Sequence, residues 1–224
     1  TVTPVNDAPV TGPDTATTAF NTPVTNINVL ANDSDVDGDT LSVTGATVDP
    51  TKGTVTVNGD GTLNFTPTAT ASGAVVITYT VSDGTTSTNG TLTVTVGANT
   101  APVADAVAVS GLEDAASIVF SLSGSDADAG GSIASAQVTA LPLASQGVLY
   151  LADGVTAVTT AMVLTPAQMV GLKFVPAADY NGTVTIPYSV TDNAGLVSTA
   201  TANAVITVTP VNDAPVTGPD TATT

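Results

Sequence analysis

Residues 53–67 read GTVTVNGDGTLNFTP, two short runs in which apolar and polar residues alternate, joined by the turn sequence Asn58-Gly59-Asp60-Gly61. Alternation with a period of two is typical of strands that bury one face. Asn-Gly or Asp-Gly between two such runs indicates a β-hairpin. The same alternation recurs at 75–81 and 91–96. The sequence therefore predicts an all-β chain.

Seven runs of this kind fit into the first half of the chain, near Ala16 and at 24–30, 41–47, 53–57, 62–66, 75–81 and 90–96. Seven short strands separated by turn residues predict a seven-stranded sandwich of two sheets. The second half follows the same plan with one insertion, Thr165-Pro166-Ala167-Gln168. Thr165 is suited to the N-cap position, Pro166 to the first helical position and Gln168 to the capping box. They predict a single helical turn that closes one end of the second sandwich.

An exact repeat sets the domain organisation. The phrase TVTPVNDAPVTGPDTATT occupies residues 1–18 and returns letter for letter at 207–224, and a weaker copy, ANTAPV, stands at 98–103. We therefore expect two domains joined end to end, at 1–97 and 98–209, with 210–224 beginning the next repeat of a tandem array. Because each Pro restrains the residue before it to extended backbone, we expect taut joints.

Composition excludes several partners and chemistries. The net charge is −17, and the only basic residues are Lys52 and Lys173. This charge disfavours nucleic acids and anionic membranes as partners. The chain has no Cys, His or Arg, so a disulfide framework is absent and a hydrolase would have few groups to use. No apolar run is long enough to span a bilayer, and we expect no membrane insertion by this segment.

Acidic and amide residues gather in the predicted loops. If the strands alternate in direction, the loops after the second, fourth and sixth strands lie at the end of the sandwich that receives the preceding linker. The candidates there are Asn6, Asp7, Asp33, Asp35, Asp37, Asp39 and Asp83 in the first domain, and Asn99, Asp126, Asp128 and Asp192 in the second. At the opposite end of the second domain we expect Glu113, Asp114, Asp179, Asn212 and Asp213.

These acids predict a calcium site. Clustered carboxylates repel one another, and two lysines are too few to neutralise them. Many hard oxygen ligands favour calcium over zinc or magnesium. The segment DSDVDG at 33–38 is similar to the first half of an EF-hand loop, but Thr44 stands where that loop requires Glu and the flanks are strand-like, so we exclude an EF-hand. A solvated acidic turn that supplies charge for solubility is the alternative.

Short sequence phrases along nearly the whole chain resemble those of a known protein family. VNDAPV, NDSDVDGDTLSVT, ITYTVSDG, LEDA, SDADAG and FVPAADYNGTVTIPYSVTDNAG resemble the cadherin-like and immunoglobulin-like extender repeats of large bacterial adhesins secreted by type I systems, the RTX adhesins. The resemblance implies that each domain is an immunoglobulin-like or cadherin-like sandwich. It also implies a role in cell adhesion and biofilms, outside the cell at the bacterial surface. Neighbouring repeats of one polypeptide would be the partners, holding adhesive domains away from the cell.

The resemblance also implies where calcium binds. Cadherin repeats hold calcium at joints through an acid in the first loop, an Asn-Asp linker and a DxD loop of the next domain. The matching positions are Glu113, Asn6, Asp7, Asn212, Asp213, Asp35, Asp37, Asp126 and Asp128. Two departures stand out, because Asn21 replaces the first-loop acid of the first domain and the middle linker reads Asn99-Thr100. We expect that joint to bind less calcium or to bind it more weakly.

Three classes of function are compatible with these features. We expect a monomeric, non-enzymatic extender or a related surface-layer spacer. A carbohydrate- or ice-binding sandwich is the alternative, although sugar sites favour exposed aromatic platforms and the chain has four Tyr and four Phe. Asp126 and Asp128 would be the acid/base pair of a hydrolase, which we disfavour for want of a visible cleft.

Overall fold

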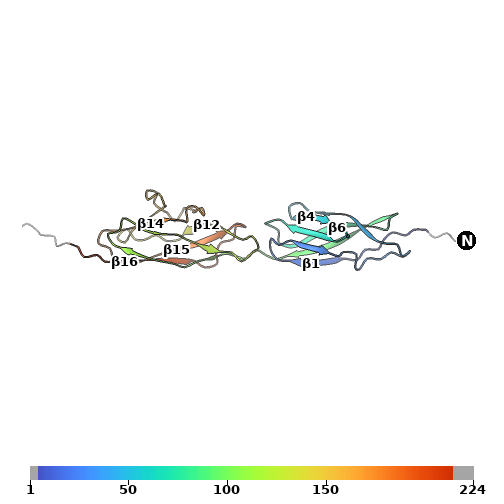
Figure 1. The fold of residues 1–224 in the computed structure, drawn as a ribbon, viewed down its shortest axis with the longest axis horizontal. Helices are drawn as coiled ribbons and strands as arrows, with labels where there is room; N and C mark the ends of the chain where they lie inside the picture. Colours follow the sequence, from blue (N-terminus) through green and yellow to red (C-terminus); the bar gives the residue numbers. More distant parts are fainter. Residues whose placement is uncertain (1–4, 214–224) are drawn as a thin grey trace, which may run out of the picture. The chain divides into compact units, whose positions relative to one another are not determined.

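The computed structural model describes residues 5–213. Within this range the chain contains sixteen strands and no helix, hence no helix of the length and apolarity needed to cross a bilayer. Contacts divide the chain into two compact units, drawn in Figure 1 from blue to green and from green to red. Unit 1 runs to Thr100 and includes 127–131, and unit 2 comprises 101–126 and the residues from Ser132 on. The predicted next repeat lies, from residue 214 on, outside the described residues.

Unit 1 has the seven strands that the sequence predicts. They are β1 (Asp14–Thr18), β2 (Val24–Ile27), β3 (Ser42–Val48), β4 (Gly53–Val57), β5 (Leu63–Pro67), β6 (Gly73–Ser82) and β7 (Ser87–Val96). One sheet has the order β1-β7-β6-β3 and the other β2-β5-β4. The predicted hairpin joins β4 and β5, and the Gly61 N–H closes its turn by donating to the Asn58 carbonyl at 3.0 Å.

Alternating side chains of the two sheets form the core of unit 1. Leu63, Phe65, Ile77, Tyr79 and Leu92 are all fully buried, as expected for the inward positions of strands that bury one face. The large Tyr79 ring fits only because β7 offers no side chain beside it. A Cβ atom on the paired residue of β7, a glycine, would overlap that ring.

Unit 2 repeats this plan and adds to it. Its strands are β8 (Val103–Ala104), β9 (Val107–Leu112), β10 (Ile118–Phe120), β11 (Gly124–Ser125), β12 (Ile133–Val138), β13 (Gly147–Tyr150), β14 (Leu172–Pro176), β15 (Gly182–Asp192) and β16 (Ala202–Thr209). The sheets are β12-β15-β16-β9 and β10-β14-β13. The short pair β8-β11 was not predicted. A separate core forms around Leu149, Phe174 and Tyr188.

The predicted helical turn of unit 2 is a single hydrogen-bonded turn without an assigned helix. The Met169 N–H donates to the Thr165 carbonyl at 3.0 Å. The Gln168 side-chain oxygen accepts from the Thr165 N–H at 3.0 Å. The capping chemistry is therefore present, but the chain turns into β14 before a helix can extend.

In both units the first and last long strands are parallel neighbours in one sheet. β1 pairs with β7 over Asp14–Thr18, and β9 pairs with β16 over Val107–Leu112. Each unit therefore receives the chain at one end of this sheet and releases it at the other. The loops at these two ends carry the acidic residues considered next.

Candidate metal-binding site

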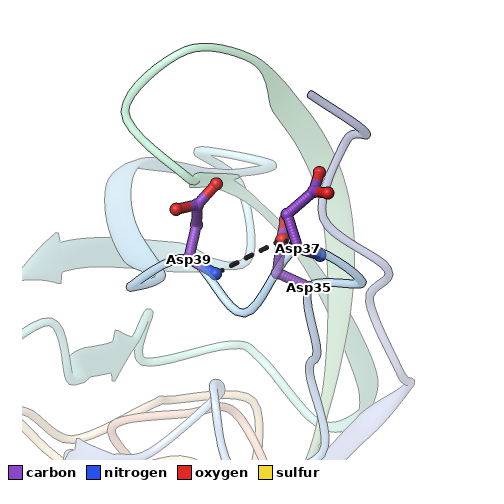
Figure 2. Close-up of side chains that lie close together, drawn as sticks. All are labelled: Asp35, Asp37 and Asp39. Atoms are coloured by element: carbon purple, nitrogen blue, oxygen red, sulfur yellow. Dashed lines mark hydrogen bonds between the residues drawn. The ribbon is translucent and has the colours of Figure 1, made fainter. Parts of the chain in front are cut away.

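The loop between β2 and β3 brings three carboxylates together. Asp35, Asp37 and Asp39 each offer an oxygen, and these atoms lie within 4.8 Å of one another. Figure 2 shows the three side chains rising from one turn of the loop. We call them the Asp35–Asp39 cluster. Alternate residues of the motif converge because the backbone turns tightly at Gly38, where φ is 81°, a conformation that favours glycine.

Asp35 organises the turn and keeps one oxygen available. Its Oδ1 atom accepts the N–H of Asp37 at 2.9 Å and that of Asp39 at 3.4 Å, the contact dashed in Figure 2. Its Oδ2 atom is buried and has no hydrogen-bond partner. A buried carboxylate oxygen without a donor costs free energy. A cation at this position would offset that cost.

The segment before β1 reaches the same loop, as the sequence predicts. The Asp7 N–H donates to Asp37 Oδ2 at 2.8 Å. The Asn6 amide donates to Asp83 Oδ2 at 2.9 Å. Asp83 also accepts from the Thr86 side chain and backbone, and these bonds, that of Asn6 first, hold the pKa of Asp83 well below its usual range. Four predicted residues, Asn6, Asp7, Asp37 and Asp83, are thus connected by hydrogen bonds.

Asp33 lies apart from the Asp35–Asp39 cluster. Its Oδ1 atom accepts the Gly12 N–H at 2.9 Å. The buried Tyr79 hydroxyl donates to Asp14 Oδ2 at 2.6 Å and lies 3.5 Å from Asp33 Oδ2. Burial, and then the charge of Asp33, raises the pKa of Asp14. Asp33 therefore anchors the start of β1, and its expected role as a metal ligand stays a prediction.

A second acidic group forms in unit 2, at the end where the chain leaves it. Glu113 is 6% exposed, although it carries a carboxylate. Its Oε1 atom accepts the Val211 N–H at 2.7 Å, and its Oε2 atom accepts from the Asn181 amide at 3.2 Å. Two of the predicted elements, the loop after β9 and the chain after β16, therefore meet at Glu113.

The electrostatics of Asp213 locate the remaining acids of this group. The charge of Asp114, then burial, then the charges of Asp179 and Glu113 raise the pKa of Asp213. These four carboxylates are named here the Glu113 cluster. Asn212 lies beside them on the same segment and donates to the Asp213 carbonyl at 3.3 Å.

The other candidates are placed as follows. Asp128 accepts the Thr100 N–H at 2.7 Å. Asp192 is 1% exposed and accepts the N–H groups of Ala194 and Leu196 at 2.9 and 2.8 Å, so it shapes the turn after β15. Asn99 and Asp126 are partly buried.

Asp14, Tyr79 and Asn181 are not among the residues predicted from the sequence. Tyr79 and Tyr188 occupy the same place in the phrases YTVSDG and YSVTDNAG, and this shared position was the available signal. Asn181 lies two residues after the predicted Asp179, but its reach to Glu113 depends on the turn at Asp179, where φ is 56°.

The residues present fit calcium. Both clusters offer carboxylate oxygens, hard ligands of the kind that calcium takes in sets of about six to eight. The buried Asp35 Oδ2 atom is an unpaired acceptor. The two lysines lie elsewhere, Lys52 near Asp49 and Lys173 near Asp153. Among residues 5–213, neither cluster thus receives a positive charge from a lysine.

Comparison with known proteins agrees with the resemblance found in the sequence. Residues 5–97 match the family model of a cadherin-like domain, and residues 99–209 match that of a bacterial Ig domain. No curated protein sequence matches the chain.

Solved structures with a similar chain course include cadherins and one glycoside hydrolase. A Drosophila N-cadherin fragment is 12% identical with a TM-score of 0.49, and the comparison covers 91% of this chain and 65% of that one. Human protocadherin-24 EC1-2 is 16% identical with a TM-score of 0.37, covering 90% and 95%. An endo-fucoidan hydrolase of glycoside hydrolase family 107 is 19% identical with a TM-score of 0.39, covering 95% and 30%. TM-scores below 0.5 carry no functional information.

Proposed function

Because residues 5–97 form a cadherin-like domain and residues 99–209 a bacterial Ig-like domain, we propose that the chain is a calcium-binding extender of a large bacterial surface adhesin. Domains of these families are typically extracellular, structural or adhesion-related, and without enzymatic activity. The finer assignment rests above all on one observation, the buried and unpartnered Asp35 Oδ2 within the Asp35–Asp39 cluster.

Different residues of unit 1 would have different roles in binding calcium. Asp35 fixes the turn through Oδ1 and presents Oδ2. Asp37 and Asp39 add carboxylate oxygens beside it. Asn6 and Asp7 tie the incoming segment to the same loop. Bound calcium supplies positive charge that offsets the repulsion between these carboxylates.

The Glu113 cluster is the second calcium site of the proposal. Glu113 is held in place by Val211 and Asn181. Asp114, Asp179 and Asp213 place further charge around it. Since Asp213 lies on the chain that leaves unit 2 after β16, calcium there would order the segment that leads into the following repeat.

In the extender that we propose, calcium rigidifies the joints between neighbouring repeats of one polypeptide. The module would be monomeric and located outside the cell. It would project adhesive domains of the adhesin from the surface. Within residues 5–213 all four Phe are buried, and so are Tyr79 and Tyr188, which disfavours the alternative of an aromatic sugar-binding platform.

Calcium titration by calorimetry, combined with thermal unfolding, tests the proposal. Calcium at one hundred times its dissociation constant should stabilise the folded state by about 2.7 kcal/mol per site. A chelator should reverse the gain, and magnesium should give less because it demands stricter geometry. No heat of binding and no change in melting temperature would refute the proposal.

A matched pair of variants assigns the effect to the loop. Asp35→Asn should lower the number of calcium ions bound. Asp49→Asn should leave it unchanged, because Asp49 lies in the turn between β3 and β4, where its carboxylate accepts the Thr51 N–H at 2.9 Å. Equal losses in both variants would mean that the response is nonspecific screening.

A further inference from the structure

The parallel pairing of terminal strands has a mechanical consequence for each unit. Asp14–Thr18 of β1 pair in register with Leu92–Val96 of β7. In unit 2, Val107–Leu112 of β9 pair in register with Ala204–Thr209 of β16. In each unit the pair consists of the first and the last of the long strands.

A pull on the two chain ends loads this pair in shear. The pull draws β1 towards its N-terminal end and β7 towards its C-terminal end. Because the two strands are parallel neighbours, these pulls run in opposite directions along one ladder, whose evenly spaced bonds share the load. A pull across the strands would instead break the same bonds one after another.

A buried tyrosine fixes the start of the first strand in each unit. The Tyr79 hydroxyl donates to Asp14 Oδ2 at 2.6 Å and lies 3.2 Å from the Val29 carbonyl. The Tyr188 hydroxyl donates to the carbonyls of Asp105 and, at 2.8 Å, Ser123. Both tyrosines are fully buried. Tyr79 lies on β6 and Tyr188 on β15, each the neighbour of the last strand of its unit. Each hydroxyl therefore reaches across that last strand to the entry end of the parallel pair.

We propose that the parallel terminal strands of each unit, fixed at their entry by the buried tyrosine hydroxyl, form a load-bearing clamp. The clamp makes each unit resist a pull along the chain. It is a property of the fold of each unit and does not depend on calcium. Its failure in an experiment is thus separable from failure of the proposed calcium function.

The two clamps differ in strength. The ladder of unit 1 continues by one bond, from the Gly97 N–H to the Thr18 carbonyl at 2.8 Å. The ladder of unit 2 is one pair longer. It continues through the Glu113 N–H to the Thr209 carbonyl at 3.0 Å and gains a bond from Thr209 Oγ1 to the Gly111 carbonyl at 3.1 Å. Unit 1 should yield first.

Single-molecule force spectroscopy on the whole chain in chelator tests the proposal. The two units are told apart by the chain that they release, because 99–209 is longer than 5–97 and extended chain adds about 3.5 Å per residue. Two unfolding steps are expected, the shorter at lower force. The chain lacks cysteine, so handles can also be attached through Val10→Cys and Thr85→Cys, both near the entry end of unit 1. That geometry peels β1 from β7, and unit 1 should then unfold at lower force than when pulled by its ends.

Two tyrosine variants test the role of the hydroxyl. Tyr188→Phe should speed unfolding of unit 2 at constant force by roughly tenfold, the effect of losing two ordinary hydrogen bonds. These are the bond that the hydroxyl shares between the two carbonyls and the bond that it accepts from the Ser123 N–H at 3.3 Å. Tyr180→Phe is the control, because its hydroxyl also makes two bonds, to Gln146 and Thr183, but neither residue lies at the entry end of β9. Equal forces in the two pulling geometries of unit 1 would overturn the proposal, as would equal effects of the two variants. The comparison of geometries uses intact core residues, so it remains decisive even if Tyr188→Phe fails to fold.

Discussion

The Asn6 side-chain amide donates a hydrogen bond of 2.9 Å to Asp83 Oδ2, joining the segment before β1 to the turn between β6 and β7. Asp83 Oδ1 in turn accepts the N–H groups of Thr85 and Thr86, each at 2.6 Å. One carboxylate therefore fixes both its own turn and the incoming chain. The charge of Asp83 is stabilised by donors before any cation is added.

We predict that Asn6→Ala raises the pKa of Asp83 towards its ordinary value of 3.8, because the Asn6 bond is the largest cause of the lowering. The folded-state pKa lies below the unfolded one. The resulting stability is thus present above the ordinary pKa and is lost as pH falls through the folded pKa. Carboxyl-carbon NMR titration in chelator measures the pKa of Asp83 in the variant and in the wild type. Asp153, whose pKa is lowered chiefly by Thr156, is the internal reference and should not move.

The Glu113 cluster gives a prediction of the opposite sign. The pKa of Asp213 is raised, first by the charge of Asp114, so its contribution to stability is present at low pH and is lost as pH rises through the folded pKa. Asp114→Asn should lower the pKa of Asp213 and raise the melting temperature in chelator. In calcium the same variant should be less stable than the wild type. Thermal denaturation with and without calcium measures both effects. The same change in melting temperature under the two conditions would contradict the prediction.

Local pattern was enough to predict the strands of unit 1. Alternating apolar residues, such as Leu63 and Phe65 in β5, become buried because a pleated strand with one dry face has no other arrangement. The hairpin at Asn58–Gly61 followed from turn chemistry. The convergence of Asp35, Asp37 and Asp39 followed from their alternate spacing in a loop.

Long-range pairing could not be predicted in the same way. Nothing local in β1 shows that it lies parallel to β7, more than seventy residues later. The inward turn of Asp33 depends on Gly12 and Tyr79, which come from other elements. The sequence also does not reveal the bulge in β2, where Asn26 has a φ of 58° and its N–H donates to Asn64 Oδ1 at 2.9 Å. Each of these features exists only once the sheets have packed.

Packing around Tyr79 gives a prediction with a matched control. Gly90→Ala should destabilise the protein by about 1–3 kcal/mol, because the added methyl group overlaps the buried Tyr79 ring and the sandwich must shift. Gly45→Ala, in β3, should be close to neutral, since a Cβ there meets no atom within 4 Å. Urea denaturation measures both variants. Similar losses for the two would mean that the Tyr79 ring moves aside freely.

Asp33 and Asp35 stand two positions apart and should respond differently to substitution. Asp33→Ala removes the acceptor of the Gly12 N–H and should cost about 1–3 kcal/mol, with and without calcium. Asp33→Asn keeps an acceptor oxygen and should recover most of that loss. Asp35→Asn should instead preserve stability in chelator and reduce the gain on adding calcium, because it removes charge from the Asp35–Asp39 cluster. Thermal unfolding of the three variants, each with calcium and with chelator, separates the two roles. A loss of calcium response in Asp33→Asn equal to that of Asp35→Asn would place Asp33 among the ligands and contradict its role as the anchor of β1.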